Sequence, residues 1–69
     1  MNEEIELQKQ IAQHIAVELE AAVPDEPALF RLRCACAAAK GIVARAKAAG
    51  TVEELRYNLS RLEDNDYSI

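Results

Sequence analysis

The sequence predicts an all-α protein: an antiparallel helical hairpin plus a short third helix, assembled as a homodimeric helical bundle. Three features indicate this fold. Apolar residues recur every three or four positions, as on one face of an α-helix. Two breaks, one at a pair of prolines and one at a glycine, divide the chain into three segments. Alanine supplies 13 of the 69 residues, and because alanine buries little apolar area, one chain forms only a thin core that a second copy would complete.

A single domain is expected over residues 1–63, with helices over about residues 3–22, 26–49 and 52–63 and a flexible tail over residues 64–69. The first helix can begin with Asn2 as its N-cap, and the acidic residues that follow suit the positive end of the helix dipole. Its apolar stripe comprises Ile5, Leu7, Ile11, Ala12, Ile15, Leu19, Ala22 and Val23.

The segment from Val23 to Pro27 separates the first two helices. Pro24 disfavours helical backbone at the residue before it. We expect Asp25 to be the N-cap of the second helix and Pro27 to occupy its first turn. Gly50 provides the C-terminal stop.

The second helix carries two apolar faces, so it needs two neighbours. The first helix is expected to cover the face with the larger residues: Leu29, Leu32, Ala35, Cys36, Ala39, Ile42, Val43 and Ala46. The second face follows the 4-3-4-3-4 spacing of a coiled-coil seam and is the predicted dimer interface: Phe30, Cys34, Ala37, Gly41, Ala44 and Ala48. A monomeric three-helix bundle is the alternative.

The third helix should begin at a capping box formed by Thr51 and Glu54. Its apolar stripe comprises Val52, Leu55, Leu59 and Leu62. About a dozen residues span roughly 18 Å, less than the roughly 27 Å from Phe30 to Ala48. This helix is therefore expected to fold over the ends of the second face without covering it.

Catalysis, cofactors and metal binding find no support in the sequence. It has no nucleophile–base pair and no glycine-rich phosphate loop. Cys34 and Cys36 do not have metal-ligand spacing, and they are expected to be small buried hydrophobic residues, with an intersubunit disulfide or a reactive thiol as alternatives. An acidic N-terminus and the lack of an apolar run of about 20 residues predict no leader, no membrane span and a cytoplasmic location.

Nucleic-acid binding is the alternative function. Residues 46–55 resemble the turn of helix-turn-helix domains, although Arg56 stands where that family has an apolar residue. An RNA-binding hairpin would use Arg31, Arg33, Lys40, Arg45 and Lys47. The formal net charge of −4 and the acids that open the third helix argue against contact with phosphate.

A protein-binding regulator or inhibitor fits the composition better. Residues 1–26 hold seven acids and a single lysine, so an acidic surface is expected to bind a basic partner. The candidate partner-binding residues are Glu6, Gln10, Gln13, Val17, Glu18, Glu20 and Tyr57.

The short, acidic, alanine-rich and dimer-prone chain also resembles small regulators encoded in early regions of bacteriophage genomes, in particular those of the anti-quorum-sensing, anti-activator kind. That resemblance implies binding to an acyl-homoserine-lactone-responsive transcription regulator in the cytoplasm of a bacterial host, which prevents the regulator from engaging DNA. It assigns no role to an individual residue.

Overall fold

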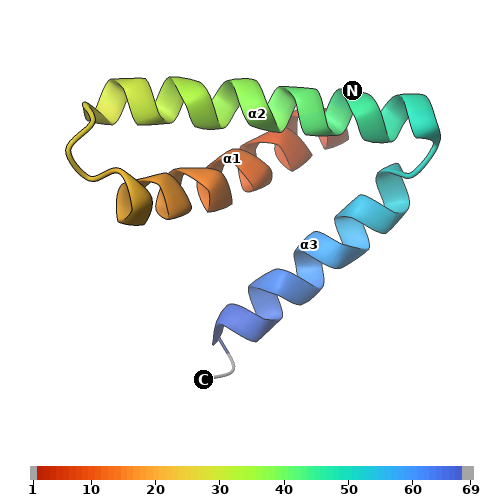
Figure 1. Ribbon diagram of the computed structural model, residues 1–69. Helices are drawn as coiled ribbons and strands as arrows, with labels where there is room; N and C mark the ends of the chain where they lie inside the picture. Colours follow the sequence, from red (N-terminus) through yellow and green to blue (C-terminus); the bar gives the residue numbers. More distant parts are fainter. Residues whose placement is uncertain (1, 68–69) are drawn as a thin grey trace.

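Residues 2–67 form three α-helices, and no strand occurs among them (Figure 1). The computed structural model describes the backbone of these residues and the side chains of residues 3–63. The helices are α1 (Asn2–Ala22), α2 (Ala28–Ala49) and α3 (Val52–Tyr67). The prediction of an all-α protein is therefore confirmed. Within this part of the chain, no helix has both the length and the apolar character that crossing a membrane requires.

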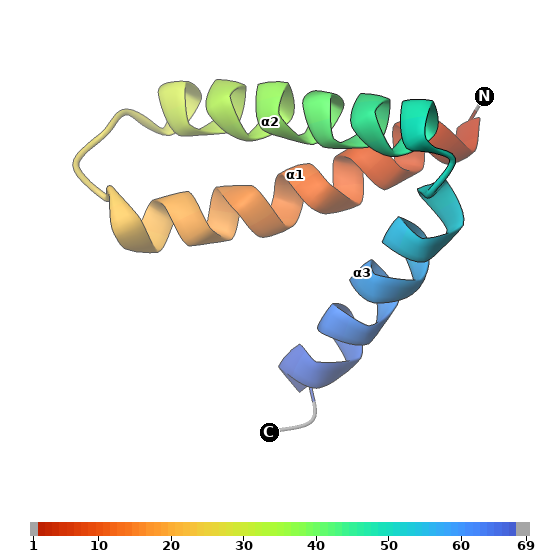
Figure 2. The ribbon, with the colours of Figure 1, turned by 45° about the vertical axis from the view of Figure 1, so that its right-hand side comes forward.

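α1 and α2 lie side by side and run in opposite directions, whereas α3 leaves the end of α2 at a steep angle (Figures 1 and 2). α1 and α3 both lie on the same side of α2. In both views no other helix lies over the opposite side of α2, as far as residues 2–67 show.

α2 begins two residues later than predicted, at Ala28. Its N-cap is Pro27, with φ −57° and ψ 141°, and no side chain caps it. The prediction that Asp25 is the N-cap is therefore wrong. The physical reason is that Pro27 disfavours helical backbone at Glu26, so the helix cannot start before the proline. The Arg31 guanidinium instead closes this loop, since it donates hydrogen bonds to the backbone carbonyls of Pro24 and Glu26.

α2 ends at Gly50, as predicted. The glycine has φ +72°, in the left-handed region that it adopts without a side-chain clash. Its N–H donates to the Lys47 carbonyl at 3.3 Å, and the Thr51 N–H donates to the Ala46 carbonyl at 2.8 Å. These two hydrogen bonds form a Schellman motif, which satisfies the last carbonyls of α2.

Thr51 stands directly before α3, where an N-cap was predicted, and its carbonyl accepts the first helical hydrogen bond from Leu55 at 3.0 Å. The Thr51 hydroxyl lies 3.5 Å from the Ala46 carbonyl, so it also touches the end of α2. α3 continues to Tyr67, so the predicted end near residue 63 is four residues short. Residues 68–69 of the predicted tail lie outside the described part of the chain.

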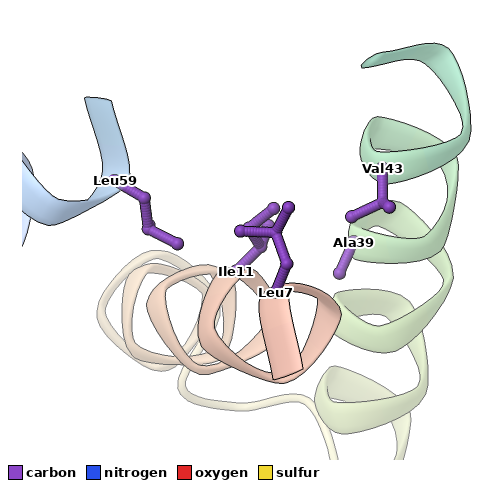
Figure 3. Close-up of a cluster of buried hydrophobic side chains, with 5 residues drawn as sticks. All are labelled: Leu7, Ile11, Ala39, Val43 and Leu59. Atoms are coloured by element: carbon purple, nitrogen blue, oxygen red, sulfur yellow. The ribbon is translucent and has the colours of Figure 1, made fainter. Parts of the chain in front are cut away.

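The core is one small cluster that joins all three helices (Figure 3). Leu7 and Ile11 of α1 lie between Leu59 of α3 on one side and the α2 pair Ala39 and Val43 on the other. Around the cluster, partly buried side chains complete the packing: Ala12, Ile15, Val52 and Leu55.

α3 therefore packs on α1, and two polar contacts support this arrangement. Arg56 Nη2 lies 3.0 Å from Glu3 Oε1, and His14 Nε2 lies 3.4 Å from Glu63 Oε2. Within one chain the third helix does not fold over the ends of the second face of α2 as expected, because Phe30 and Ala48 are both exposed. Leu59 is turned toward α1 instead.

Half of the predicted inner face of α2 is buried: Ala35, Ala39, Val43 and Ala46. The other half is exposed: Leu29, Leu32, Cys36 and Ile42. None of residues 20–34 is buried. The larger side chains at the beginning of α2 therefore remain in water, because the segment around Pro24 and Pro27 leaves that end of the two helices without a shared core.

Candidate functional site

The side of α2 that faces away from α1 and α3 is an apolar surface that the described part of the chain leaves uncovered. We call it the outer face of α2 and define it by Phe30, Cys34, Ala37, Gly41, Ala44 and Ala48. All six residues are exposed, and Phe30 is 52% exposed. With 100° of rotation per residue, these six residues point almost opposite to the buried alanines and Val43 around the axis of α2. The outer face is therefore a second apolar surface, and no other helix of the described residues covers it.

The small residues of the outer face leave the α2 backbone open to close approach. A Cβ added at Gly41 would meet no atom within 4 Å. A glycine inside a helix lowers helix stability by about 1 kcal/mol relative to alanine. Packing inside one chain thus gives no reason for glycine at position 41, whereas a second backbone pressed against this face would.

Cationic side chains border the outer face on both sides. Arg33, Lys40 and Lys47 follow one edge, and Arg31 and Arg45 follow the other. Two of the five already have partners in their own chain. Lys47 Nζ lies 3.2 Å from Glu4 Oε2, and Arg31 caps the loop before α2. The cations therefore serve partly to bind the acidic first helix and the loop.

The exposed side of α1 brings together most of the predicted partner-binding residues. We call it the acidic face of α1 and define it by Glu6, Gln10, Gln13, Val17 and Glu20, all of which are exposed. Val17 is 68% exposed and lies among these polar neighbours. Lys9 Nζ lies 3.9 Å from Glu6 Oε1, a surface pair that contributes little stability.

Two of the predicted partner-binding residues lie apart from this face. Glu18 lines a hollow between α1 and α3 together with His14, Leu19 and Leu62. Tyr57 precedes the buried Leu59 by two positions, so its ring points away from α1. Arg61 Cζ lies 5.9 Å from the centre of that ring, a cation–π contact within α3.

A groove between α1 and α2 was not predicted from the sequence. The groove has a volume of about 310 Å³, and its lining includes Ile5, Ala12, Leu32 and Cys36. The only signal for it was that Ile5 lies near the edge of the apolar stripe of α1. Leu32 and Cys36 were predicted to be buried, and their exposure opens the groove.

Both cysteines are free and exposed, so the prediction that they are buried is wrong. Cys34 belongs to the outer face of α2, and Cys36 lies on the other side of the helix. Among the residues that the structure describes, no three His, Cys, Asp or Glu side chains are grouped so as to hold a metal ion.

The outer face of α2 is apolar and long, and the acidic face of α1 is polar with one apolar residue. Comparison with protein-family models, with curated proteins and with solved structures returned no match.

Proposed function

We propose that the chain is a non-catalytic, protein-binding regulator that acts as a homodimeric helical bundle. In this proposal α1 and α2 form an antiparallel hairpin, and two copies join through the outer face of α2. The observation that carries the proposal is that this apolar face is exposed along its whole length, from Phe30 to Ala48. Continuous exposed apolar surface of this kind marks interaction sites in small proteins.

The acidic face of α1 is the proposed contact for a basic partner. It lies on a different helix from the dimer contact, so both surfaces can be used at once. The partner that fits is the positively charged DNA-binding surface of a transcription regulator, because opposite charges speed encounter and set orientation. Occupying that surface would prevent the regulator from engaging DNA, which is the anti-activator role that the resemblance to phage regulators implies.

Binding to nucleic acid is the second candidate, and one observation favours it. All five cations of residues 27–49 border one face of α2, with no acid among them. RNA or DNA would contact Arg33, Lys40 and Arg45, for which the described residues provide no ion pair like those of Lys47 and no loop contact like that of Arg31.

Sedimentation of single variants tests the homodimer. Ala37→Leu and Gly41→Leu each add bulk to the outer face, and both should convert a dimer at tens of micromolar into a 7.6 kDa particle. Ala38→Leu is a matched control, since residue 38 is exposed on α2 but lies off the outer face. A dimer that survives both substitutions would place the interface elsewhere.

A gel-shift assay tests the regulator function. Adding the protein to a purified acyl-homoserine-lactone-responsive regulator on its operator DNA should release the DNA. The double variant Glu6→Lys, Glu20→Lys should lose this effect, whereas Glu53→Lys, Glu54→Lys, with the same change in charge, should keep it. Equal activity of the two double variants would refute the acidic-face mechanism. Direct binding of the protein to the DNA alone would favour the nucleic-acid alternative.

A further inference from the structure

The chain exposes more surface than a compact monomer of its mass. Its accessible surface is 5445 Å², whereas a compact monomer of 7.6 kDa exposes about 4,300 Å². Its radius of gyration is 12.7 Å, against about 11 Å for a compact chain of this length. The excess of about 1,100 Å² is close to the roughly 800 Å² that each partner buries in a stable protein–protein interface. One interface per chain would therefore bury most of the excess.

The outer face of α2 is the surface on which a second copy can lie without obstruction. α1 and α3 both lie on the opposite side of α2, in both views (Figures 1 and 2). α3 turns away from this face at Gly50, so a helix laid along α2 would not meet α1 or α3.

The six positions of the outer face are symmetric about residue 39. Positions 37 and 41, 34 and 44, and 30 and 48 lie at equal distances before and after it. Two antiparallel copies of α2 related by a twofold axis at this level therefore place each of these positions opposite its counterpart. This is the layer pattern of antiparallel coiled coils, in which each a position meets a d position.

We infer that the α2 helices of the two copies pack antiparallel, with the twofold axis level with Ala39. This inference rests on the proposed homodimer. The largest residue of the face, Phe30, then packs on Ala48 of the partner subunit. Cys34 packs on the partner subunit's Ala44, and Ala37 packs on the partner subunit's Gly41. In each layer the larger side chain meets a smaller one, so no layer places two large side chains face to face and the two helices can approach closely.

A parallel dimer would pack far less evenly. It would place Phe30 against the same residue of the partner at one end and glycine against glycine near the middle. Two facing phenylalanines hold the backbones apart and would leave the alanine layers without contacts. In both orientations the cations at the borders of one copy meet cations of the other. Charge therefore does not favour either orientation, whereas side-chain size favours the antiparallel one.

The native Cys34 makes a direct test possible. In the antiparallel register the two Cys34 residues are ten positions apart along the axis, about 15 Å at the helical rise. A disulfide requires Cα atoms within about 7 Å. Cys34 and a cysteine at position 44 of the other chain, in contrast, face each other directly.

The experiment compares the Cys36→Ser protein with the same protein carrying Ala44→Cys, both oxidised with copper phenanthroline and run on a non-reducing gel. We expect almost complete conversion of the Ala44→Cys protein into a covalent dimer, and no covalent dimer from its parent. Ala49→Cys in the same background is the matched control, because residue 49 is exposed but lies off the outer face, and it should cross-link at least tenfold less.

Each contrary outcome has a distinct meaning when the oxidised samples are also sedimented. A covalent dimer of the parent through Cys34 would show a parallel dimer, which refutes the register and leaves the homodimer standing. A non-covalent dimer that cross-links at neither position, or equally at positions 44 and 49, would place the interface on another face. A 7.6 kDa particle without cross-links would refute the homodimer itself.

Discussion

The two faces of α2 contain similar residues and have opposite surroundings. The inner face buries Ala35, Ala39, Val43 and Ala46 against α1, and Ala39 is 1% exposed. The outer face is also built mostly of alanine and glycine, yet every one of its residues is exposed. In an alanine-rich helix, therefore, the residue types do not decide which face is buried. The large side chains of the neighbouring helix decide it, here Leu7 and Ile11.

The largest expected effect comes from adding bulk to each face in turn. Ala39→Leu should lower the free energy of unfolding by about 1–3 kcal/mol, because the inner face has no room for three more carbons. Ala44→Leu, on the outer face, should change it by less than about 0.5 kcal/mol. Urea unfolding followed by circular dichroism, at a dilution where the chain is monomeric, measures both. Equal effects would mean that the two faces are equally packed within one chain.

Gly41→Ala sharpens the comparison, because its expected effects on the monomer and on the dimer have opposite signs. The monomer should gain about 0.5–1 kcal/mol of stability, since alanine favours the helix and its Cβ meets no atom within 4 Å. The dimer should dissociate more readily, since each added methyl group separates the two backbones.

Thermal unfolding at low concentration and sedimentation at high concentration measure the two effects of Gly41→Ala. Gly50→Ala is the control: at φ +72° the substitution is strained and should destabilise the chain by about 1 kcal/mol. If the Gly41→Ala protein dimerises as tightly as the wild type, the outer face of α2 is not the dimer interface.

Salt should affect the two proposed contacts in opposite directions. Five cations per chain border the outer face, so sodium chloride should screen their repulsion and tighten the dimer by about two- to tenfold between 50 and 500 mM. Binding of a basic partner to the acidic face of α1 should weaken over the same range. Sedimentation and fluorescence anisotropy at several salt concentrations measure the two trends, and a dimer that loosens in salt would contradict the cationic border.

The smallest expected effect belongs to the border between the two faces. Glu4→Gln removes the charge that lies 3.2 Å from Lys47, where the Lys47 side chain is exposed and that of Glu4 is partly exposed. The substitution should lower the free energy of unfolding by about 0.2–1 kcal/mol, as for other surface ion pairs. Urea titration at 20 mM and 300 mM salt measures it, and the difference should shrink at the higher salt. A larger loss would mean that this pair holds α1 against α2.

Much of the fold was predictable because it depends on local signals. Gly50 ends α2 with left-handed backbone, and Thr51 precedes α3, both as predicted. The start of α2 was misjudged because the restriction that Pro27 places on Glu26 outweighs the capping tendency of Asp25. The end of α3 was placed too early because polar residues near a terminus fit a tail as well as a helix.

The candidate surfaces were predictable only in part. Helical spacing correctly grouped the outer face of α2 and most of the acidic face of α1, since residues three and four apart share a face. It could not show that Tyr57 faces away from α1, because that depends on which side of α3 meets Leu7 and Ile11. Nor could it show that Leu32 and Cys36 are exposed, because burial depends on how closely two helices approach at a given level.

The sequence by itself determined the three helices, their breaks and the two apolar faces of α2, because caps, prolines, glycines and the 3.6-residue period act within a few positions of the chain. Only the tertiary structure decided that α3 packs on α1, that the loop end of α1 and α2 has no buried core, and that the outer face of α2 is uncovered. These features depend on where large side chains from distant segments of the chain meet. A chain so rich in alanine has few large side chains, so its local sequence does not determine how the helices pack.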